Sequence, residues 1–316
     1  MTSTVGRFQR RVWLDPELAA INVMIPRFDL TDLANARALE LLLGKQDRTI
    51  TPGVTSTDHT VAGRGGNSIS VRVYRPDDRS GPRGALFYIH GGGFMLGGLH
   101  TEDERCELYA AQVGCVVIGV DYRLAPEHPF PAAFEDCADA LEWVGANASD
   151  LGIDARRIAV GGNSAGGAVA ASLALRSRTT GPLVSHQFLI NPVLDCRSTT
   201  PSALAFVDTP VWTRADNLLM WSSYLDEASA PVDYTASPSL ASDLVDAPPA
   251  SIWIADQDPL RDEALEYVRR LLGDGVQVSF HQYLGTFHGF DSYRMTKLGQ
   301  RALADQVWAL QRAFLR

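Results

Sequence analysis

Residues 157–167 read RIAVGGNSAGG, and this stretch decides the fold class. A short apolar run leads directly into residues 162–166, which satisfy G-x-S-x-G, and small residues typical of a helix follow. A serine hydroxyl is a poor nucleophile unless a strained strand-to-helix turn holds it exposed beside a base. Glycine on both sides removes the Cβ atoms that would collide in such a turn. The stretch therefore predicts a nucleophile at Ser164; the alternative is a glycine-rich turn with an incidental serine.

Outward from this stretch, short apolar runs alternate with helix-like stretches. Residues 68–74 (SISVRVY) alternate polar and apolar side chains, as in a strand with one buried face. Continuous apolar runs, typical of strands covered on both faces, occupy residues 85–90, 115–122, 157–162, 186–191 and 251–255. A late strand is expected at residues 276–283, and helices at residues 130–146, 165–177 and 262–272. This alternation predicts an α/β fold, with a mostly parallel central sheet of about eight strands flanked by helices.

Two stretches interrupt the alternation. Residues 1–50 look helical, most clearly in ANARALELLLGK, and precede the first expected strand. Residues 196–247 form an insertion punctuated by Pro, Ser and Asp, which carries a second helical pattern, WTRADNLLMWSSYL. We expect both stretches to form a helical cap, or lid, over the ends of the sheet. Residues 51–195 and 248–316 then form the catalytic core.

Composition limits the partners of this chain of 316 residues. Its formal charge of −9 repels phosphate backbones and anionic membranes, so we expect no nucleic acid and no membrane as partner. A small neutral or apolar substrate fits better. A C-terminal helix would place four apolar side chains on one face, for which core packing is favoured over a possible homodimer contact. They are Leu303, Val307, Leu310 and Phe314.

The cysteines and the N-terminal residues bear on location. The four cysteines are scattered without a C-x-x-C pair, which argues against a zinc site or a disulfide framework. The basic N-terminal residues are not followed by an apolar stretch, so no secretory signal is visible, and no apolar run has the length of a membrane span. We therefore expect a cytoplasmic protein.

A glycine-rich loop follows the apolar run at residues 85–90. It reads HGGG at residues 90–93, and three consecutive glycines expose backbone N–H groups that can point at a developing oxyanion. The N–H group of Ala165, the residue after Ser164, would add a donor. The alternatives are a flexible loop or a phosphate cradle, but neither G-x-G-x-x-G nor G-x-x-x-x-G-K-[ST] occurs in the chain.

The base is sought among seven histidines, none of which forms an H-E-x-x-H pair for a metal. His288 is favoured because it lies on a loop after the last expected strand. His281 falls within that strand, where a packed or solvent-facing histidine is expected. His90 precedes the nucleophile, whereas strand–turn–helix nucleophiles are followed by an acid and then by the histidine.

The acid should follow a strand between Ser164 and His288. SIWIADQDPLRDE offers two aspartates near the strand end, Asp256 and Asp258, and spacing alone favours Asp258 only modestly. Asp262 and Glu263 also qualify by position, but they read as ordinary acids in the first turn of a helix, where the macrodipole favours them.

Five segments resemble, in order, the hormone-sensitive-lipase-like family (family IV) of bacterial esterases. They are YIHGGGF, DYRLAPEHPFPAAFEDC, GGNSAGG, DQDPLRDE and HGF, spread over residues 88–290. The resemblance implies an α/β-hydrolase fold, in which the N-terminal helices and the insertion form the cap. One departure is Asn163, where many members have Asp, from which we expect altered hydrogen bonding in the loop.

The resemblance also implies roles for individual residues. Ser164 would be the nucleophile, Asp258 the orienting acid and His288 the base. The oxyanion hole would consist of backbone N–H groups from Gly92, Gly93 and Ala165, with Gly91 shaping the loop. Asp121, Tyr122 and Arg123 would support the loops of the active site without reacting.

Together these features predict a serine carboxylesterase that hydrolyses short- to medium-chain acyl esters through an acyl-enzyme, without cofactor or metal. Activity should fall as acid protonates the histidine. Apolar side chains of the insertion and of the glycine loop are candidates for the substrate pocket, although packing against the sheet is the commoner role for each. They are Phe94, Met95, Phe206, Trp212, Leu218, Leu219 and Trp221.

Other activities share the same arrangement. A lactonase, amidase, carbamate hydrolase or deacetylase would pass through similar tetrahedral intermediates, so the sequence does not separate them. Small-molecule receptors related to the family have lost the histidine. Because serine, acid and histidine are all present in this chain, a receptor is disfavoured.

Overall fold

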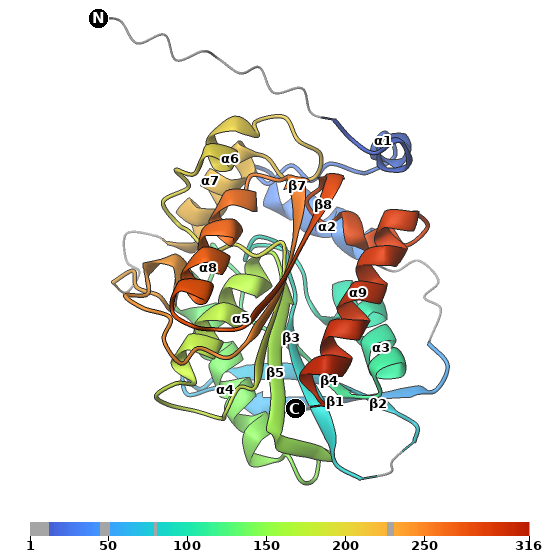
Figure 1. Cartoon of the computed structure of the whole chain (residues 1–316), viewed down its shortest axis with the longest axis vertical. Helices are drawn as coiled ribbons and strands as arrows, with labels where there is room; N and C mark the ends of the chain where they lie inside the picture. Colours follow the sequence, from blue (N-terminus) through green and yellow to red (C-terminus); the bar gives the residue numbers. More distant parts are fainter. Residues whose placement is uncertain (1–12, 45–50, 79–80, 226–230, 316) are drawn as a thin grey trace, which may run out of the picture.

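One sheet carries all the strands of the described residues, in the order β1-β2-β4-β3-β5-β6-β7-β8 (Figure 1). The computed structural model describes residues 13–44, 51–78, 81–225 and 231–315. The strands are β1 (Val54–Ala62), β2 (Ser68–Pro76), β3 (Arg83–Ile89), β4 (Val116–Asp121), β5 (Ile153–Asn163), β6 (His186–Ile190), β7 (Ala250–Gln257) and β8 (Val278–Phe287). β2 pairs antiparallel with β1 and β4, and all other pairs are parallel. The predicted α/β fold with a mostly parallel sheet is confirmed.

Helices cover both faces of the sheet. They are α1 (Pro16–Asn22), α2 (Leu33–Gly44), α3 (Leu99–Val113), α4 (Ala132–Ala146), α5 (Ala165–Arg176), α6 (Pro201–Ala205), α7 (Arg214–Tyr224), α8 (Arg261–Gly273) and α9 (Lys297–Ala313), with short 3-10 helices η1 (Pro238–Leu240) and η2 (Phe290–Ser292). α3 and α9 pack on one face of the sheet, and α4, α5 and α8 pack on the other (Figure 1). The predicted helices agree with α4, α5 and α8 to within two residues at each end.

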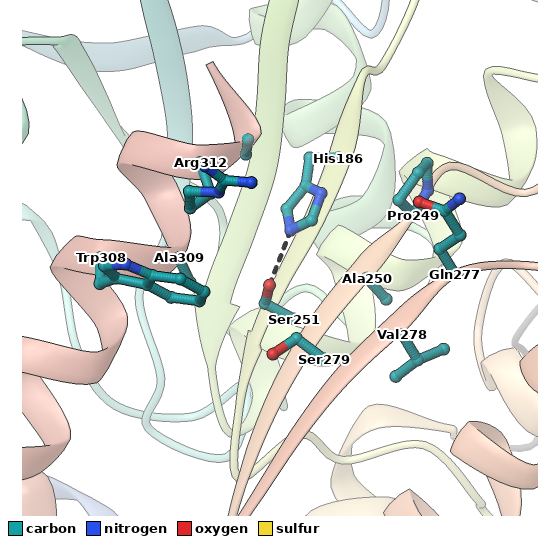
Figure 2. A pocket seen from close by; sticks show the side chains of 11 residues that line it. His186, Pro249, Ala250, Ser251, Gln277, Val278, Ser279, Trp308, Ala309 and Arg312 are labelled. Atoms are coloured by element: carbon teal, nitrogen blue, oxygen red, sulfur yellow. Dashed lines mark hydrogen bonds between the residues drawn. The ribbon is translucent and has the colours of Figure 1, made fainter. Parts of the chain in front are cut away.

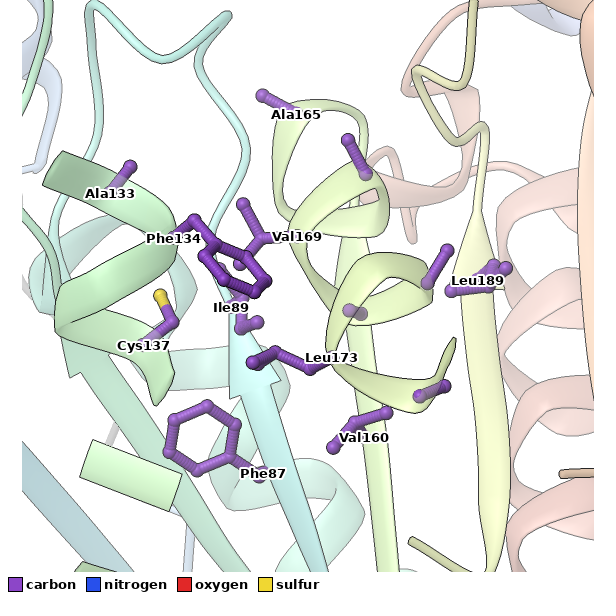
Figure 3. Close-up of a cluster of buried hydrophobic side chains, with 14 of the residues drawn as sticks. Phe87, Ile89, Ala133, Phe134, Cys137, Val160, Ala165, Val169, Leu173 and Leu189 are labelled. Atoms are coloured by element: carbon purple, nitrogen blue, oxygen red, sulfur yellow. The ribbon is translucent and has the colours of Figure 1, made fainter. Parts of the chain in front are cut away.

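β3 shows how the continuous apolar runs fill both layers of the core. Successive side chains of a strand point to opposite faces, so Phe87 and Ile89 enter the cluster beneath α4 and α5, while Leu86 and Tyr88 enter the cluster beneath α3 and α9. Figure 3 shows Phe87 and Ile89 facing Leu173 of α5. Both faces of β3 are buried. A one-residue slip in register would turn each side chain to the opposite layer of the core and disrupt its packing there. The carboxyl end of β3, where HGGG begins, is thereby fixed.

The C-terminal helix packs as expected. Val307, Leu310 and Phe314 are buried in the cluster beneath α3 and α9, and Leu303 packs against it. The expectation that this apolar stripe belongs to the core is therefore confirmed.

Two elements escaped the sequence reasoning. β1 has mostly exposed side chains and pairs only with β2 at the edge of the sheet, so its sequence, VTSTDHTVA, carries little apolar signal. α3 contains charged residues that are buried in the fold, including Asp103, Arg105 and Glu107. These charges hide the apolar periodicity that would have indicated a helix.

The candidate site residues lie at the end of the sheet where the parallel strands have their carboxyl ends. β3, β5, β7 and β8 run parallel, so the segments that follow them meet at their carboxyl ends. Figure 1 shows four helices at this end of the sheet: α1, α2, α6 and α7. They come from the two stretches that we expected to form a cap. Parts of those stretches, namely residues 1–12, 45–50 and 226–230, lie outside the described residues. Within the described ranges, no helix has both the length and the apolar composition of a membrane-spanning segment.

Candidate active site

Ser164 occupies a strained turn between β5 and α5. Its backbone has a φ of 55° and a ψ of −119°, a conformation that non-glycine residues rarely adopt. Glycine is required on both sides for lack of space: a Cβ on Gly162 would lie 2.4 Å from the carbonyl carbon of Gly166, and one on Gly166 would lie 2.1 Å from the carbonyl oxygen of Ile89. The close contact between α5 and the end of β3 therefore presents the serine hydroxyl beside the glycine loop.

His288 lies between Ser164 and Asp258. Its Nε2 is 3.0 Å from Ser164 Oγ, and its Nδ1 is 2.7 Å from Asp258 Oδ2. Because the carboxylate accepts a hydrogen bond from Nδ1–H, the neutral ring offers Nε2 as the acceptor for the serine hydroxyl. All three side chains are buried, with 4%, 5% and 1% exposure for Ser164, His288 and Asp258. The arrangement can take a proton from the serine and pass it to a leaving group.

The three other candidate acids have different partners. Asp256 accepts hydrogen bonds from the backbone N–H of Thr286 (3.0 Å) and from Gln257 Nε2 (2.8 Å). Asp262 accepts one from the backbone N–H of Ser202 (2.7 Å). The structure thus places Asp258, and none of the others, against the histidine.

Glu263 is not the ordinary helix acid that its position suggested. Its carboxylate is buried and accepts a 2.6 Å hydrogen bond from the backbone N–H of Leu194. Burial raises the pKa of Glu263 well above its usual range. Glu263 does lie in the first turn of α8, as its position indicated, but this turn packs against the segment after β6 and the side chain is buried.

The other two histidines that the sequence reasoning weighed lie apart from this arrangement. His281 stacks on Trp253 within the sheet, with ring centroids 5.5 Å apart. His90 stacks on Tyr122 at 4.1 Å, and its Nδ1 donates to the carbonyl of Gly91 (2.8 Å). Tyr122 also donates to the carbonyl oxygen of His90 (3.0 Å). These contacts hold the start of the glycine loop against the segment that contains DYRLAPEHPFPAA.

The glycine loop faces Ser164. Gly91, Gly92 and Gly93 line the same cavity as Ser164 and His288. The carbonyl of Gly92 accepts hydrogen bonds from the backbone N–H groups of Met95 (3.0 Å) and Leu96 (2.8 Å), which close the loop into a turn. Ala165, the fourth residue expected at the oxyanion hole, is fully buried as the first residue of α5, directly after Ser164.

The cavity beside Ser164 has a volume of about 300 Å³. Of the seven side chains predicted to line a pocket, Trp212 lies in its wall, with its ring centroid 5.8 Å from that of His288. The other six do not line it. Leu218 is exposed on α7, and the rest pack into the protein interior: Phe94, Met95, Phe206, Leu219 and Trp221. The ring of Phe94 stacks on that of Tyr224, with centroids 3.7 Å apart, so Phe94 contributes to interior packing and not to the cavity wall.

Sequence reasoning missed several side chains of the cavity wall. Three of them are acids: Glu40 from α2, Glu102 from α3 and Asp216 from α7. Glu102 lies in the first turn of the helix that follows HGGGFMLGG, and this short separation from the glycine loop was the available signal. Glu40 and Asp216 reach the cavity only through packing between distant segments, which the sequence does not encode locally.

Asn163, the departure from the family pattern, also lines the cavity. Among the described residues its buried Oδ1 has no hydrogen-bond partner. Burial raises the pKa of Glu102, although Arg105 and the Asn163 amide lower it. The amide is neutral, so, unlike an ionised aspartate, it adds no negative charge beside Glu102.

Arg105 links α3 to the segment after His288. Its Nε lies 2.9 Å from Glu102 Oε2, its Nη1 lies 2.7 Å from Asp291 Oδ2, and its Nη2 donates to Ser292 Oγ at 2.9 Å. Burial alone would raise the pKa of Asp291, but the charge of Arg105 keeps that pKa below the ordinary value. One cation thus serves two buried carboxylates, and the group of three keeps a net negative charge when both acids are ionised.

A second Ser–His pair lies at the opposite end of the sheet (Figure 2). His186 Nε2 is 2.9 Å from Ser251 Oγ, beside a cavity of about 310 Å³. Both residues lie at the amino ends of β6 and β7, within paired strands. Ser251 therefore has neither the strained turn nor the adjacent glycine loop of Ser164. In parallel sheets of this kind, ligands bind at the carboxyl ends of the strands.

Potential metal ligands do not gather anywhere in the part of the chain that the structure describes: no group of three or more His, Cys, Asp or Glu side chains there could hold an ion.

Comparisons with known proteins agree with this geometry. Residues 86–292 match a family described by its alpha/beta hydrolase fold. Carboxylesterase NlhH of Mycobacterium tuberculosis is 37% identical over 274 residues, 84% of each chain, and the ethyl acetate hydrolase of Pseudomonas putida is 36% identical over 254 residues, 79% of each chain. Among solved structures, a bacterial heroin esterase has a TM-score of 0.92 and 41% identity, covering 95% of this chain and 98% of its own.

His90 provides a test of how tightly the glycine loop is buried. Burial lowers the pKa of His90 to about 4, whereas in the unfolded chain it is near 6.5. Between these values the unfolded chain binds a proton that the folded protein does not. The free energy of unfolding should therefore fall as pH falls through this window, by about 3 kcal/mol from this residue.

Urea unfolding of the wild-type and of His90→Gln across the same window measures this contribution. We expect a shallower pH dependence in the variant, whereas His128→Gln, at an exposed histidine, should keep the wild-type slope. Equal slopes in all three proteins would contradict the buried, neutral state of His90.

Proposed function

We propose a residue-level mechanism for this chain from the premise that it belongs to the hormone-sensitive-lipase-like family of α/β hydrolases and is a carboxylic-ester hydrolase. In the proposal Ser164 is the nucleophile, His288 the general base and Asp258 the acid that orients it. The observation that carries this assignment is the continuous contact from Ser164 Oγ through the His288 ring to Asp258, at 3.0 and 2.7 Å.

The first half of the reaction forms an acyl-enzyme. His288 Nε2 takes the hydroxyl proton as Ser164 Oγ bonds to the ester carbonyl carbon, and the carbonyl oxygen becomes an oxyanion. The N–H groups of Gly92, Gly93 and Ala165 would hold that oxygen, and each such donor is worth about 2.7–4 kcal/mol in the barrier. The imidazolium then gives its proton to the alcohol oxygen as the carbon–oxygen bond breaks.

The second half releases the acid. A water molecule loses its proton to His288 and bonds to the acyl carbon, and the same backbone donors stabilise the second oxyanion. The imidazolium returns the proton to Ser164 Oγ as the bond to the serine breaks, which leaves a carboxylic acid and the original enzyme. Asp258 stabilises the imidazolium in both halves without itself taking up the proton.

The substrates in this proposal are esters with short to medium acyl chains. A cavity of about 300 Å³ holds a small acyl group better than a long lipid chain. The names of the relatives, a carboxylesterase and an ethyl acetate hydrolase, point the same way. Lactones, amides and carbamates stay alternatives, since they would use the same residues.

The cap is part of the proposal. Residues from the N-terminal stretch, Phe28 and Leu30, and from the insertion, Val211 and Trp212, contribute to the wall of the cavity. We infer that these two stretches close the site over residues of the core, so that they influence which esters enter.

A cytoplasmic location is also inferred. All four cysteines are described and unpaired: Cys106, Cys115, Cys137 and Cys196. Free thiols are typical of a reducing compartment, where disulfides rarely persist.

Replacement of the nucleophile tests the mechanism. Ser164→Ala should lower hydrolysis of p-nitrophenyl acetate by at least about a thousandfold, because the acyl-enzyme can no longer form. Circular dichroism should show an unchanged fold. Ser251→Ala is the matched control, since this serine also lies against a histidine, and it should keep activity. The assignment fails if Ser164→Ala retains wild-type turnover or if a fluorophosphonate probe labels a different residue.

A series of p-nitrophenyl esters tests the chain length. The value of kcat/KM should be highest for short to medium acyl groups and fall for long ones, because the cavity cannot hold them. Trp212→Ala removes an indole from the cavity wall, and we expect it to shift the optimum to longer chains. A wild-type optimum at long chains would overturn the proposed substrate range.

Self-association is the last element of the proposal. β8 is an edge strand with one neighbour, and Leu284 on it and Trp308 on α9 are 69% and 57% exposed. Asp15 N–H donates to the carbonyl of Gly285 (2.9 Å), but among the described residues no second strand pairs with β8, and a strand edge with apolar side chains favours pairing with a second copy. Light scattering should give twice the mass of one chain, and Leu284→Lys should halve it, while Leu183→Lys at an exposed position outside the strands should not. A wild-type monomer would exclude the homodimer.

A further inference from the structure

The cavity beside Ser164 has an acidic and aromatic wall. Its three acids come from three separate helices, and its three aromatic rings come from segments outside those helices. No lysine or arginine among the described residues lines it. The acids are Glu40, Glu102 and Asp216, and the aromatic residues are Phe28, Trp212 and Tyr293.

Of the three acids, Glu102 is the one linked to Ser164 through a neighbouring residue. The amide of Asn163, the residue directly before Ser164, is one of the groups that lower the pKa of the Glu102 carboxyl against the effect of burial. Its charge is only partly neutralised, because its partner Arg105 also binds Asp291 at 2.7 Å. A positive group in the cavity would supply the charge compensation that a buried carboxylate needs.

Glu40 approaches the glycine loop from α2. Its Oε2 accepts a hydrogen bond from the backbone N–H of Gly97 at 2.9 Å, which holds the carboxylate at the cavity wall. Arg37, one turn earlier in α2, is engaged by Glu127 at 2.7 Å and does not line the cavity. Arg37 and His100 both interact electrostatically with Glu40, but neither of them lines the cavity.

The aromatic rings strengthen the same preference. The ring of Trp212 lies beside that of His288, so a group packed on the indole would be close to the reacting ester. The face of an aromatic ring attracts a cation through its quadrupole, and the attraction is stronger where water is excluded. Carboxylates and ring faces together are the chemistry that recognises an ammonium group.

We propose that this cavity selects esters that carry an ammonium group close to the ester bond over neutral esters of the same shape. The inference rests on the proposed function, because it assigns a preference to the cavity in which Ser164 reacts. The net charge of −9 acts in the same direction, since it raises the local concentration of cations.

The test compares two esters that differ only in charge. One is acetylcholine; the other is its carbon isostere, in which a tert-butyl group replaces the trimethylammonium group. We expect wild-type kcat/KM to be about tenfold higher for the cation at low ionic strength. Added salt should reduce the ratio, because it screens the carboxylates.

Variants then assign the preference to residues. Glu102→Gln and Glu40→Gln should each lower the ratio of the two kcat/KM values, and Asp216→Asn provides a third variant should either fail to fold. Glu104→Gln is the matched control. It removes the same charge from α3, but Glu104 pairs with Arg294 and does not line the cavity, so the ratio should stay at the wild-type value.

The outcomes separate this inference from the proposed function. If wild-type protein hydrolyses both esters with no preference for the cation, or if the folded cavity variants keep the full ratio, the inferred preference is wrong while the esterase mechanism stands. If neither ester is hydrolysed and a fluorophosphonate probe does not label Ser164, the proposed function itself fails.

Discussion

The contact between the backbone of α5 and the end of β3 is the constraint on which the site depends. Gly166 lies so close to the carbonyl of Ile89 that no side chain fits between them. This contact fixes where α5 begins, and Ser164 must adopt a left-handed backbone to enter it. It also brings the glycine loop, which begins directly after Ile89, to the serine. One point of close packing therefore positions both Ser164, the proposed nucleophile, and the glycine loop that we propose as the source of backbone donors.

The remaining groups depend on the parallel order of the strands. Asp258 follows β7 and His288 follows β8, so neighbouring strand ends deliver acid and base to the same place. β7 is buried along its whole length, which fixes its register, whereas β8 is partly exposed and its position is set by parallel pairing with β7. The segments of the expected cap add side chains to the cavity wall but none to the Ser164–His288–Asp258 contact. The proposed chemistry thus rests on the core alone, whereas the cavity wall that would select the substrate draws on both the core and these two stretches.

The sequence predicted the elements with strong local patterns and missed those defined by packing. RIAVGGNSAGG and HGGG are short strings whose geometry is set by nearby glycines, and their surroundings were foreseen. Spacing could not decide between Asp256 and Asp258, because a register irregularity between Ala255 and Gln257 alters how the strand end presents them. The aromatic residues of the insertion were expected in the pocket, but stacking such as that of Phe94 on Tyr224 is a long-range choice that no local pattern encodes.

Arg105 has a consequence for how the site comes apart. Through Glu102 it holds the helix after the glycine loop, and through Asp291 and Ser292 it holds the turn that follows His288. A fluctuation that frees the histidine turn must also break buried ion pairs on α3. The turn that carries His288 and the glycine loop should therefore open as one cooperative unit. Their backbone amides should then show similar protection in hydrogen exchange.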